Sequence, residues 1–450
     1  MDSSNFLAGF AFYFVFLAGG MAAISAARGQ FADVKPQLIL YFASLTIRFA
    51  FSVGLYVGGL STALGEDDSL GWAMGAVRVE QWTAEGLGVL DLPSVYLDSL
   101  QRQNSGYGYF VGTFQFLTNT SERLPVALLS CVAGALTVVL AYRIAYEVFT
   151  PRIAAPVGWL ACLAPSLIIW SAQTVKEPIV IVLETAVAYA CIKFRLRRLR
   201  IRHLAICAVC LPLLLSLRFY AGYIGAAMVV FSLAVPRFGG GAVSRPRAVL
   251  VALVMLALVF AGSLTGQREA ADQKFDLEYI KRMKGGLARG SGTGVETSYD
   301  LSTSSGLGLA TLVGAAHLLL APFPWQWGMG STRLALTVPE LLVWWFLFFR
   351  GVIPGFRHAL REHLNEILPL LVMLMGLGVI YSVTFGNIGL VYRQRAQLLP
   401  SLLIFAMVAF DRRAPRRAGA AFKAPVSPAQ AWSYRPAMQP PGIGWNEPRP

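Results

Sequence analysis

Long apolar runs separated by short polar segments dominate the sequence. A helix needs about 20 mainly apolar residues to cross the hydrocarbon core of a bilayer, so this pattern predicts an all-α polytopic membrane protein with about 11 transmembrane helices. The predicted spans lie near residues 6–25, 38–60, 123–147, 153–170, 178–194, 204–217, 220–236, 248–265, 337–355, 366–384 and 397–411.

Basic residues give the orientation of these spans. Six Lys and Arg residues lie between positions 193 and 202, and short loops rich in Lys and Arg face the cytoplasm. The same orientation also places the arginines that follow residues 236, 349 and 411 on the cytoplasmic side. The N-terminus is then outside and the C-terminus inside.

The apolar runs also divide the chain into regions. These are two N-terminal transmembrane helices (1–60), an outer loop with amphipathic in-plane helices and an acidic motif (61–122), transmembrane helices three to eight (123–265), a second outer loop (266–304), a re-entrant or in-plane helix with an aromatic segment (305–336), the last three transmembrane helices (337–411) and a disordered cytoplasmic tail (412–450). The run at 305–322 leaves a choice. We favour a re-entrant or in-plane helix, because an aromatic belt follows it; the alternative is that it crosses the membrane.

Composition excludes a water-soluble protein. Only 14% of the residues are charged, and the mean hydropathy is +0.58. The net charge of +14 could indicate nucleic acid. However, the basic residues fall in short clusters between apolar runs, so membrane topology explains them and no nucleic-acid partner is expected. The five cysteines all lie inside apolar runs, where they act as small hydrophobic residues.

An acidic stretch follows the second predicted span. It consists of Glu66, Asp67 and Asp68, with Trp72 close behind. A carboxylate costs roughly 2.5 kcal/mol or more at the bilayer centre but little at the surface, so an acid that acts on a lipid-borne substrate would be placed here. We interpret the stretch as the catalytic edge of the protein. The alternative is that acids flank a span on the outer side because nothing selects against them there.

Several cations lie where short outer loops normally avoid them. Four of them occupy turns predicted to be outside: Lys176, Arg218, Arg393 and Arg395. They indicate an anionic ligand, either a specific phosphate or lipid headgroups. Two further charges, Arg48 and Glu184, lie inside predicted spans, where they either pair with each other or line a cavity.

The order of these features resembles the GT-C superfamily of integral-membrane glycosyltransferases, in particular bacterial members similar to glycosyltransferase family 39 and the protein-mannosyltransferase-like group. The resemblance covers residues 65 to 400, most of the chain. The segments that carry it are Glu66-Asp67-Asp68, Tyr107-Gly-Tyr109-Phe110, Arg123-Leu-Pro125, Pro165-Ser166, Lys176-Glu177-Pro178, Pro322-Phe-Pro324-Trp325 and Tyr392-Arg393-Gln-Arg395.

The resemblance implies a polyprenyl-phosphate-linked sugar as donor, membrane lipids as surroundings, and a glycan, lipid or protein as acceptor. It places the protein in the bacterial inner membrane with its active site on the outer face. Asp67 or Asp68 would be the general base, with Glu66 beside them; one of these acids could instead orient the acceptor or hold a divalent cation, and no other cofactor is expected. Phosphate ligands would be Lys176, Arg218, Arg393 and Arg395, and groove-lining residues Tyr107, Tyr109, His317, Trp325 and Tyr392.

The sequence departs from the family pattern in two places. An additional span precedes the acidic loop, and Glu177 follows Lys176 where Asp is usual. An O-antigen-type polymerase or ligase is the nearest rival enzyme, and it would place its chemistry in 266–304. A transporter or flippase is the rival from another class. It would show inverted repeats and interrupted spans with paired charges, and the sequence has no internal repeat.

Overall fold

The described part of the chain is built from helices. The computed structural model describes residues 3–27, 34–60, 71–101, 106–196, 199–236, 281–282, 284–286, 293–295, 303–327 and 332–413. The main helices are α1 (Ser3–Ala26), α2 (Lys35–Val57), α3 (Gly71–Ala84), α4 (Leu92–Gln101), α5 (Gly106–Thr118), α6 (Arg123–Val148), α7 (Pro151–Leu163), α8 (Pro165–Ser171), α9 (Glu177–Arg195), α10 (Ile201–Leu217), α11 (Phe219–Ala234), α15 (Ser304–Leu320), α16 (Thr332–Leu347), α17 (Ile353–Glu362), α18 (Leu364–Val383) and α19 (Ile388–Arg413). The predicted all-α polytopic fold class is confirmed.

Five helices in the described residues are long and apolar enough to cross a membrane. They are α1, α2, α6, α18 and the continuous helix Val338–Glu362, which joins α16 to α17 through a π-helical turn at Phe348–Val352. The pair α7 and α8 becomes a sixth if it is one broken span. Helices α10, α11 and α15 are apolar but shorter. The predicted span at 248–265 lies outside the described residues.

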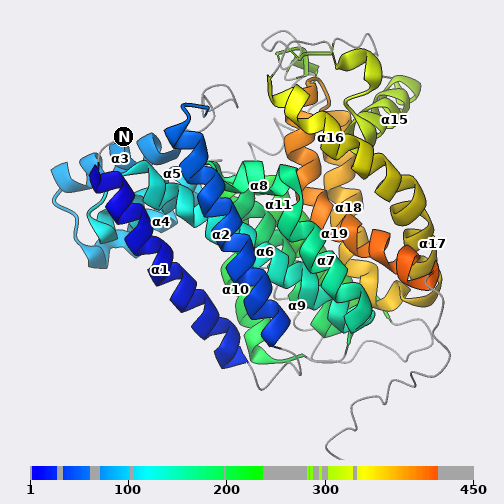
Figure 1. Ribbon diagram of the computed structural model, residues 1–450, viewed down its shortest axis with the longest axis horizontal. Coiled ribbons are helices and arrows are strands. Elements are labelled where there is room, and N and C mark those ends of the chain that lie inside the picture. Colours follow the sequence, from blue (N-terminus) through cyan, green and yellow to red (C-terminus); the bar gives the residue numbers. More distant parts are fainter. Residues whose placement is uncertain are drawn as a thin grey trace, which may run out of the picture. The chain divides into compact units, whose positions relative to one another are not determined.

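Helix α6 is the centre of the packing. It contacts α1, α2, α7 and α9, and α9 in turn contacts α10, α11 and α18 (Figure 1). Most of its side chains are buried, as expected for a helix that is apolar on every side. Helix α3 packs against α5, and both α4 and α5 contact α10. The sequence predicts amphipathic helices at Ser69–Trp82 and Val95–Leu117; the second region contains two helices, α4 and α5.

A proline divides one predicted span into two helices. The sequence predicts a single span at 153–170, but α7 and α8 meet at an angle of 54°. Ala164 lies at the break with an extended backbone (φ −60°, ψ 115°), because the following Pro165 disfavours the helical conformation in the residue before it. The predicted span is therefore bent at Ala164, and the bent pair is either one broken span or a re-entrant segment.

Helix α19 begins earlier than predicted. It starts at Ile388, so Arg393 and Arg395 lie inside a helix and not in an outer turn. The polar residues from Arg393 to Gln397 interrupt the apolar pattern, which ended the predicted span at 397. In the structure Arg395 and Gln397 are buried among polar partners, so the helix continues through them.

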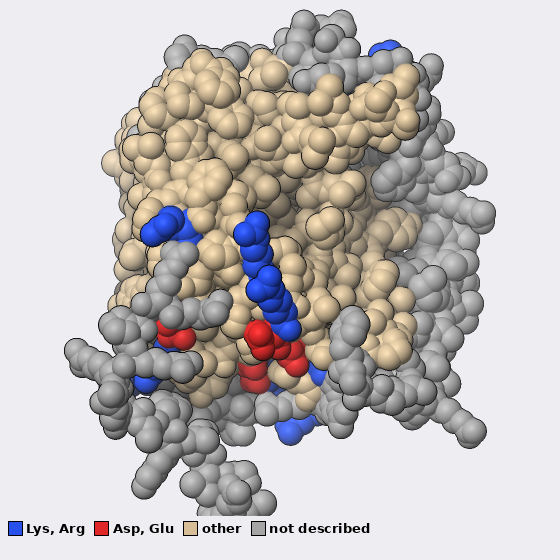
Figure 2. Space-filling view, turned by 90° about the vertical axis from the view of Figure 1, so that its right-hand side faces the viewer, with Lys and Arg blue, Asp and Glu red and all other residues tan. Residues whose placement is uncertain are grey.

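The helices of the bundle end in two groups. At one end, called the cluster end here, lie Lys176, the residue directly before α9, and Arg218, between α10 and α11. At the opposite end, Lys193 of α9 forms an ion pair with Glu147 of α6. Figure 2 shows one lateral face of the described residues, on which charged side chains gather in the lower part and most of the upper part is uncharged. Such a face suits contact with lipid.

Candidate active site

One buried carboxylate joins two guanidinium groups at the cluster end. Glu177 has no exposed surface. Its Oε1 accepts a hydrogen bond from Nη2 of Arg218 in an ion pair, and its Oε2 accepts one from Nη2 of Arg393 at 2.5 Å. Lys176 directly precedes it, and the Lys176 Nζ donates to the backbone carbonyl of Leu217 at 3.4 Å. We call Lys176, Arg218 and Arg393, together with Glu177, the cation cluster.

Local chain geometry places these side chains. Glu177 lies in the first turn of α9, with Pro178 at the next position. A carboxylate there interacts favourably with the positive end of the helix dipole, and proline is tolerated because the first N–H groups of a helix have no partner within it. Arg218 has an extended backbone (φ −150°, ψ 98°) and forms the single-residue connection between α10 and α11. The sharp turn directs its side chain toward α9.

A second layer of polar groups holds the two arginines. Nη1 of Arg218 donates to the hydroxyl of Tyr220 at 3.0 Å and to that of Tyr381 at 3.2 Å. The Tyr381 hydroxyl in turn donates to the side-chain oxygen of Gln397. The guanidinium of Arg393 lies 5.4 Å from the centre of the Trp170 ring, a favourable cation–π distance. Four helices thus contribute to fixing the arginine positions.

Tyr107 brings the start of α5 to the same place. Its side chain is buried, faces Ser130, and is in electrostatic contact with Glu177 and Arg393. Gly71, the first residue of α3, packs so closely that an added Cβ atom would lie 2.3 Å from the Tyr107 ring and 2.4 Å from the backbone oxygen of residue 174. Only glycine fits at this contact. The start of α3 is therefore held close to the turn that carries Lys176.

The three predicted acids, Glu66, Asp67 and Asp68, lie outside the described residues. Within the described residues, no group of three or more His, Cys, Asp and Glu side chains is arranged to hold a metal ion. A divalent cation on the acidic stretch stays a prediction.

Arg395 has different partners from Arg393. It is 5% exposed, and its Nη1 donates to the backbone carbonyls of Ala321 at 2.8 Å and Leu319 at 3.4 Å. These carbonyls belong to the C-terminal end of α15, where a cation is favourable. Residues 393 and 395 are two positions apart on one helix, so their side chains point to different sides. The structure therefore brings Lys176, Arg218 and Arg393 together, and places Arg395 against α15.

The predicted groove-lining residues also lie in different places, and not all of them are near the cation cluster. Tyr392 donates a hydrogen bond to Glu340, which also accepts one from Ser166 at 2.6 Å. His317 stacks on Phe385 with ring centres 4.3 Å apart. Of the predicted groove-lining residues, Tyr107 is the one that lies beside the cluster in the described part of the chain.

Two other predicted aromatics lie elsewhere. The Tyr109 ring packs beneath the guanidinium of Arg78 at 4.7 Å, on the α3 side of α5. Trp325 is 77% exposed and stacks on Phe323.

Two acids with central positions, Glu177 and Glu340, were not among the predicted site residues. For Glu177 a signal exists in the sequence, because it follows Lys176 at the first residue of a span.

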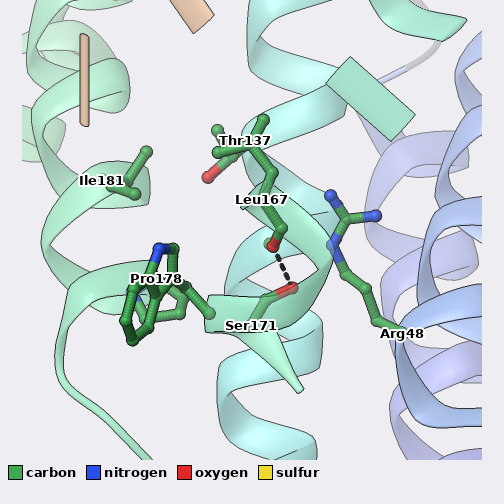
Figure 3. Close-up of a pocket in the computed structure, with 8 residues that line it drawn as sticks. Arg48, Thr137, Leu167, Ser171, Pro178 and Ile181 are labelled. Carbon is green, nitrogen blue, oxygen red and sulfur yellow. Dashed lines mark hydrogen bonds between the residues drawn. The ribbon is translucent and has the colours of Figure 1, made fainter. Parts of the chain in front are cut away.

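Arg48 and Glu184, which the sequence places inside spans, do not form a hydrogen bond with each other in the part of the chain that the structure describes. Arg48 is fully buried, and its guanidinium donates to the backbone carbonyls of Ala161 and Cys162, both at 3.2 Å. It thereby caps α7 at the break before α8. Figure 3 shows Arg48 beside the small pocket that also contains Thr137, Leu167, Ser171, Pro178 and Ile181. Its role is to hold the broken span together.

An apolar groove lies beside α18. Its volume is about 450 Å³, and it lies between α15, α17, α18 and α19. Ser382 lines one part of it and directly follows Tyr381, which contacts Arg218; Arg357 lines another part. Nearly all other lining residues are apolar. Such a groove is suited to an extended hydrocarbon chain.

The fold and the cluster together define a polytopic α-helical membrane protein with basic side chains gathered at one end of its bundle. The family model of dolichyl-phosphate-mannose-protein mannosyltransferases matches residues 106–263. This match confirms the resemblance to GT-C enzymes and indicates a membrane glycosyltransferase. It includes Tyr107, Lys176 and Arg218 but not Arg393. No curated protein and no solved structure gives a significant match.

Proposed function

We propose that the protein transfers a sugar from a polyprenyl-phosphate donor to a hydroxyl group of an envelope glycan, lipid or protein at the outer face of the bacterial inner membrane. The observation that carries this proposal is the convergence of Lys176, Arg218 and Arg393 on Glu177. These cations come from parts of the chain far apart in sequence, and such an arrangement suits a phosphate group.

The cation cluster would stabilise the leaving group. Displacement at the anomeric carbon leaves negative charge on the polyprenyl phosphate, and fixed guanidinium groups aimed at developing charge stabilise such a transition state by several kcal/mol. Arg218 and Arg393 are held by Glu177 and by aromatic neighbours, so little reorganisation is needed. Their side chains retain 10% and 14% exposure, which leaves part of each accessible to a ligand.

The apolar groove would hold the polyprenyl chain. Two of the helices that line it, α18 and α19, also carry Tyr381 and Arg393. We therefore expect a lipid in the groove to present its phosphate toward the cluster. The predicted topology supports an outer site, because Lys193 and Arg195 of α9 and Arg202 of α10 lie at the opposite end of these helices, and basic loops face the cytoplasm.

Asp67 or Asp68 remains our candidate for the general base. Asp68 is three residues from Gly71, and three residues span at most about 11 Å. Gly71 packs against Tyr107 and the backbone of residue 174. The proposal that Asp67 or Asp68 acts near the cluster rests on their closeness in sequence to Gly71, which packs against the turn before Lys176.

The test is transfer of labelled sugar from polyprenyl phosphate by full-length protein in membranes of fixed lipid composition. Asp67→Asn, Asp68→Asn and the double variant are compared with wild type, and Glu85→Gln in the same outer region serves as the matched acid control. We expect at least one Asp variant and the double variant to lose transfer while the control retains it. Full activity in the double variant would remove the base assignment.

A further inference from the structure

A carboxylate outside the cation cluster, Glu340 of α16, joins α8 to α19. Glu340 is half-buried. Its Oε1 accepts a hydrogen bond from the Ser166 hydroxyl at 2.6 Å, and its Oε2 accepts one from the Tyr392 hydroxyl. Ser166 belongs to α8 and Tyr392 to α19. One acid therefore connects three helices, and the proposed reaction gives it no role so far.

Both hydrogen-bond donors are neighbours of Trp170. Ser166 precedes Trp170 by four residues on α8, which is about one helical turn, so the two side chains share one face of that helix. The centre of the Tyr392 ring lies 6.3 Å from the centre of the Trp170 ring. Trp170 is 1% exposed. Because interiors are closely packed, its ring keeps its place only as long as these neighbours keep theirs.

Trp170 in turn positions Arg393. The guanidinium of Arg393 lies 5.4 Å from the centre of the Trp170 ring, within the range of a cation–π interaction. Arg393 also directly follows Tyr392 in α19. The contacts of Glu340 therefore fix both the ring beside the guanidinium and the stretch of backbone that carries it. A contiguous set of hydrogen bonds and ring contacts leads from Glu340 to a guanidinium of the proposed phosphate site.

Helix α8 depends on an anchor of this kind. It has seven residues and is bent by 54° from α7, so α7 does not fix its direction. Glu340 lies in the first turn of the span Val338–Glu362, where a carboxylate is costly unless it is hydrogen-bonded. A neutral side chain could fill the same space. Two hydroxyl donors make stronger hydrogen bonds to a charged acceptor, so the acid holds α8 and α19 more firmly than a neutral residue would.

We propose that Glu340 is a positioning residue that holds Trp170 against Arg393 and thereby fixes the Arg393 guanidinium for the phosphate of the donor. Glu340 acts through these neighbours and does not itself bind the donor. The inference rests on the proposed function, because Arg393 has its role in that reaction. Its consequence is that the effect of Glu340 on sugar transfer depends on the presence of Arg393.

The experiment is a double-mutant cycle with full-length protein in nanodiscs of one lipid composition. Transfer of labelled sugar from polyprenyl phosphate is measured for Glu340→Ala, Arg393→Ala and the double variant. The dissociation constant (Kd) of farnesyl phosphate is measured for the same proteins, so that the comparison does not depend on slow transfer rates alone. A small misplacement of a catalytic group lowers a rate by up to about 100-fold, and we expect a fall of that order for Glu340→Ala, with a higher Kd. In the Arg393→Ala background, Glu340→Ala should cause no further change, because the guanidinium that it positions is gone.

Two milder variants separate positioning from a folding defect. Tyr392→Phe removes one hydrogen bond to Glu340 and keeps the ring beside Trp170, and Glu340→Gln keeps an oxygen that can accept. Both should lower transfer less than Glu340→Ala, with a thermal denaturation temperature close to that of wild type. Glu362→Gln, at an exposed acid near the far end of the same continuous helix, and Tyr146→Phe on α6 are the matched controls and should follow wild type.

The possible failures are distinguishable. Wild-type transfer and Kd in Glu340→Ala would overturn the inference. A loss from Glu340→Ala that is equally large with and without Arg393 would overturn it as well, because it would show a general structural role. Either result leaves the cation cluster as the proposed phosphate site. Absence of both sugar transfer and farnesyl phosphate binding in wild type would overturn both proposals.

Discussion

Buried charges are paired in different ways at the two ends of the helical bundle. At the opposite end, Lys193 pairs with Glu147, and Arg195 donates to the backbone carbonyls of Val235 at 2.6 Å and Asn365 at 2.8 Å. There the contacts join helix ends to one another. At the cluster end a single acid, Glu177, binds two guanidinium groups and lies next to a lysine.

This difference separates a structural use of charge from a functional one. A pair of one acid and one base can hold two helices, and carbonyl groups satisfy an arginine without any ligand. Burying several like charges close together is costly in a low dielectric, so their convergence is more easily explained by an anion that they bind.

Glu177→Ala should have the largest effect. Removing one partner of a buried ion pair costs about 3–5 kcal/mol, and here two guanidinium groups lose their shared partner. We expect a large fall in the thermal denaturation temperature and no detectable sugar transfer. Denaturation of purified protein in detergent and a transfer assay measure the two effects. Wild-type stability in this variant would show that the Glu177 ion pairs are not maintained in solution.

Lys193→Ala tests the opposite end. It leaves Glu147 buried without its ion-pair partner, so we expect a loss of about 3–5 kcal/mol in unfolding free energy. Sugar transfer by the folded protein, and its Kd for farnesyl phosphate, should stay at wild-type values. A changed Kd in protein shown to be folded would mean that the two ends of the bundle are coupled, and that the charges at the Lys193 end are not purely structural.

Arg393→Ala should affect catalysis more than folding. Loss of one charge-stabilising donor lowers a rate by about 10²–10³-fold, and we expect a decrease of that order in sugar transfer. Arg361→Ala is the matched control. Arg361 lies on α17, near the C-terminal end of the continuous helix Val338–Glu362, and this variant should retain activity. Equal activity of the two variants in a transfer assay would remove Arg393 from the site.

Trp325→Ala should have the smallest effect. Its side chain is 77% exposed and stacks on Phe323, so we expect a stability change within about 0.5 kcal/mol. We expect the rate of sugar transfer to stay close to that of wild type as well. A large loss of transfer with unchanged stability would restore Trp325 as a substrate contact.

Much of the fold follows from the apolar pattern alone. The runs near 6–25, 38–60, 123–147 and 366–384 correspond to α1, α2, α6 and α18, because the length and apolarity that define a span are local properties. The break at Pro165 and the early start of α19 were missed. A proline can bend a membrane helix or be accommodated in it, and the buried partners of Arg395 and Gln397 come from distant parts of the chain.

Only part of the site could be predicted, because some of its features are local in sequence and others depend on contacts between distant residues. Lys176 and Arg218 stand out because they interrupt short outer turns, and this departure from the usual charge pattern can be seen in sequence. The contacts of Arg218 and Arg393 with Glu177 join residues far apart in the chain, and no local pattern indicates them. The separation of Arg395 from Arg393 likewise depends on α15 packing beside α19, which single-sequence periodicity does not contain.

The most direct measurement is a structure of the full-length protein bound to polyprenyl phosphate. If the cation cluster is the phosphate site, a phosphate oxygen will lie about 3 Å from a guanidinium nitrogen of Arg393 or Arg218, the distance of a charge-assisted hydrogen bond. A phosphate bound instead at the Lys193 end, with the cluster contacts to Glu177 unchanged and no lipid density beside them, would contradict the account.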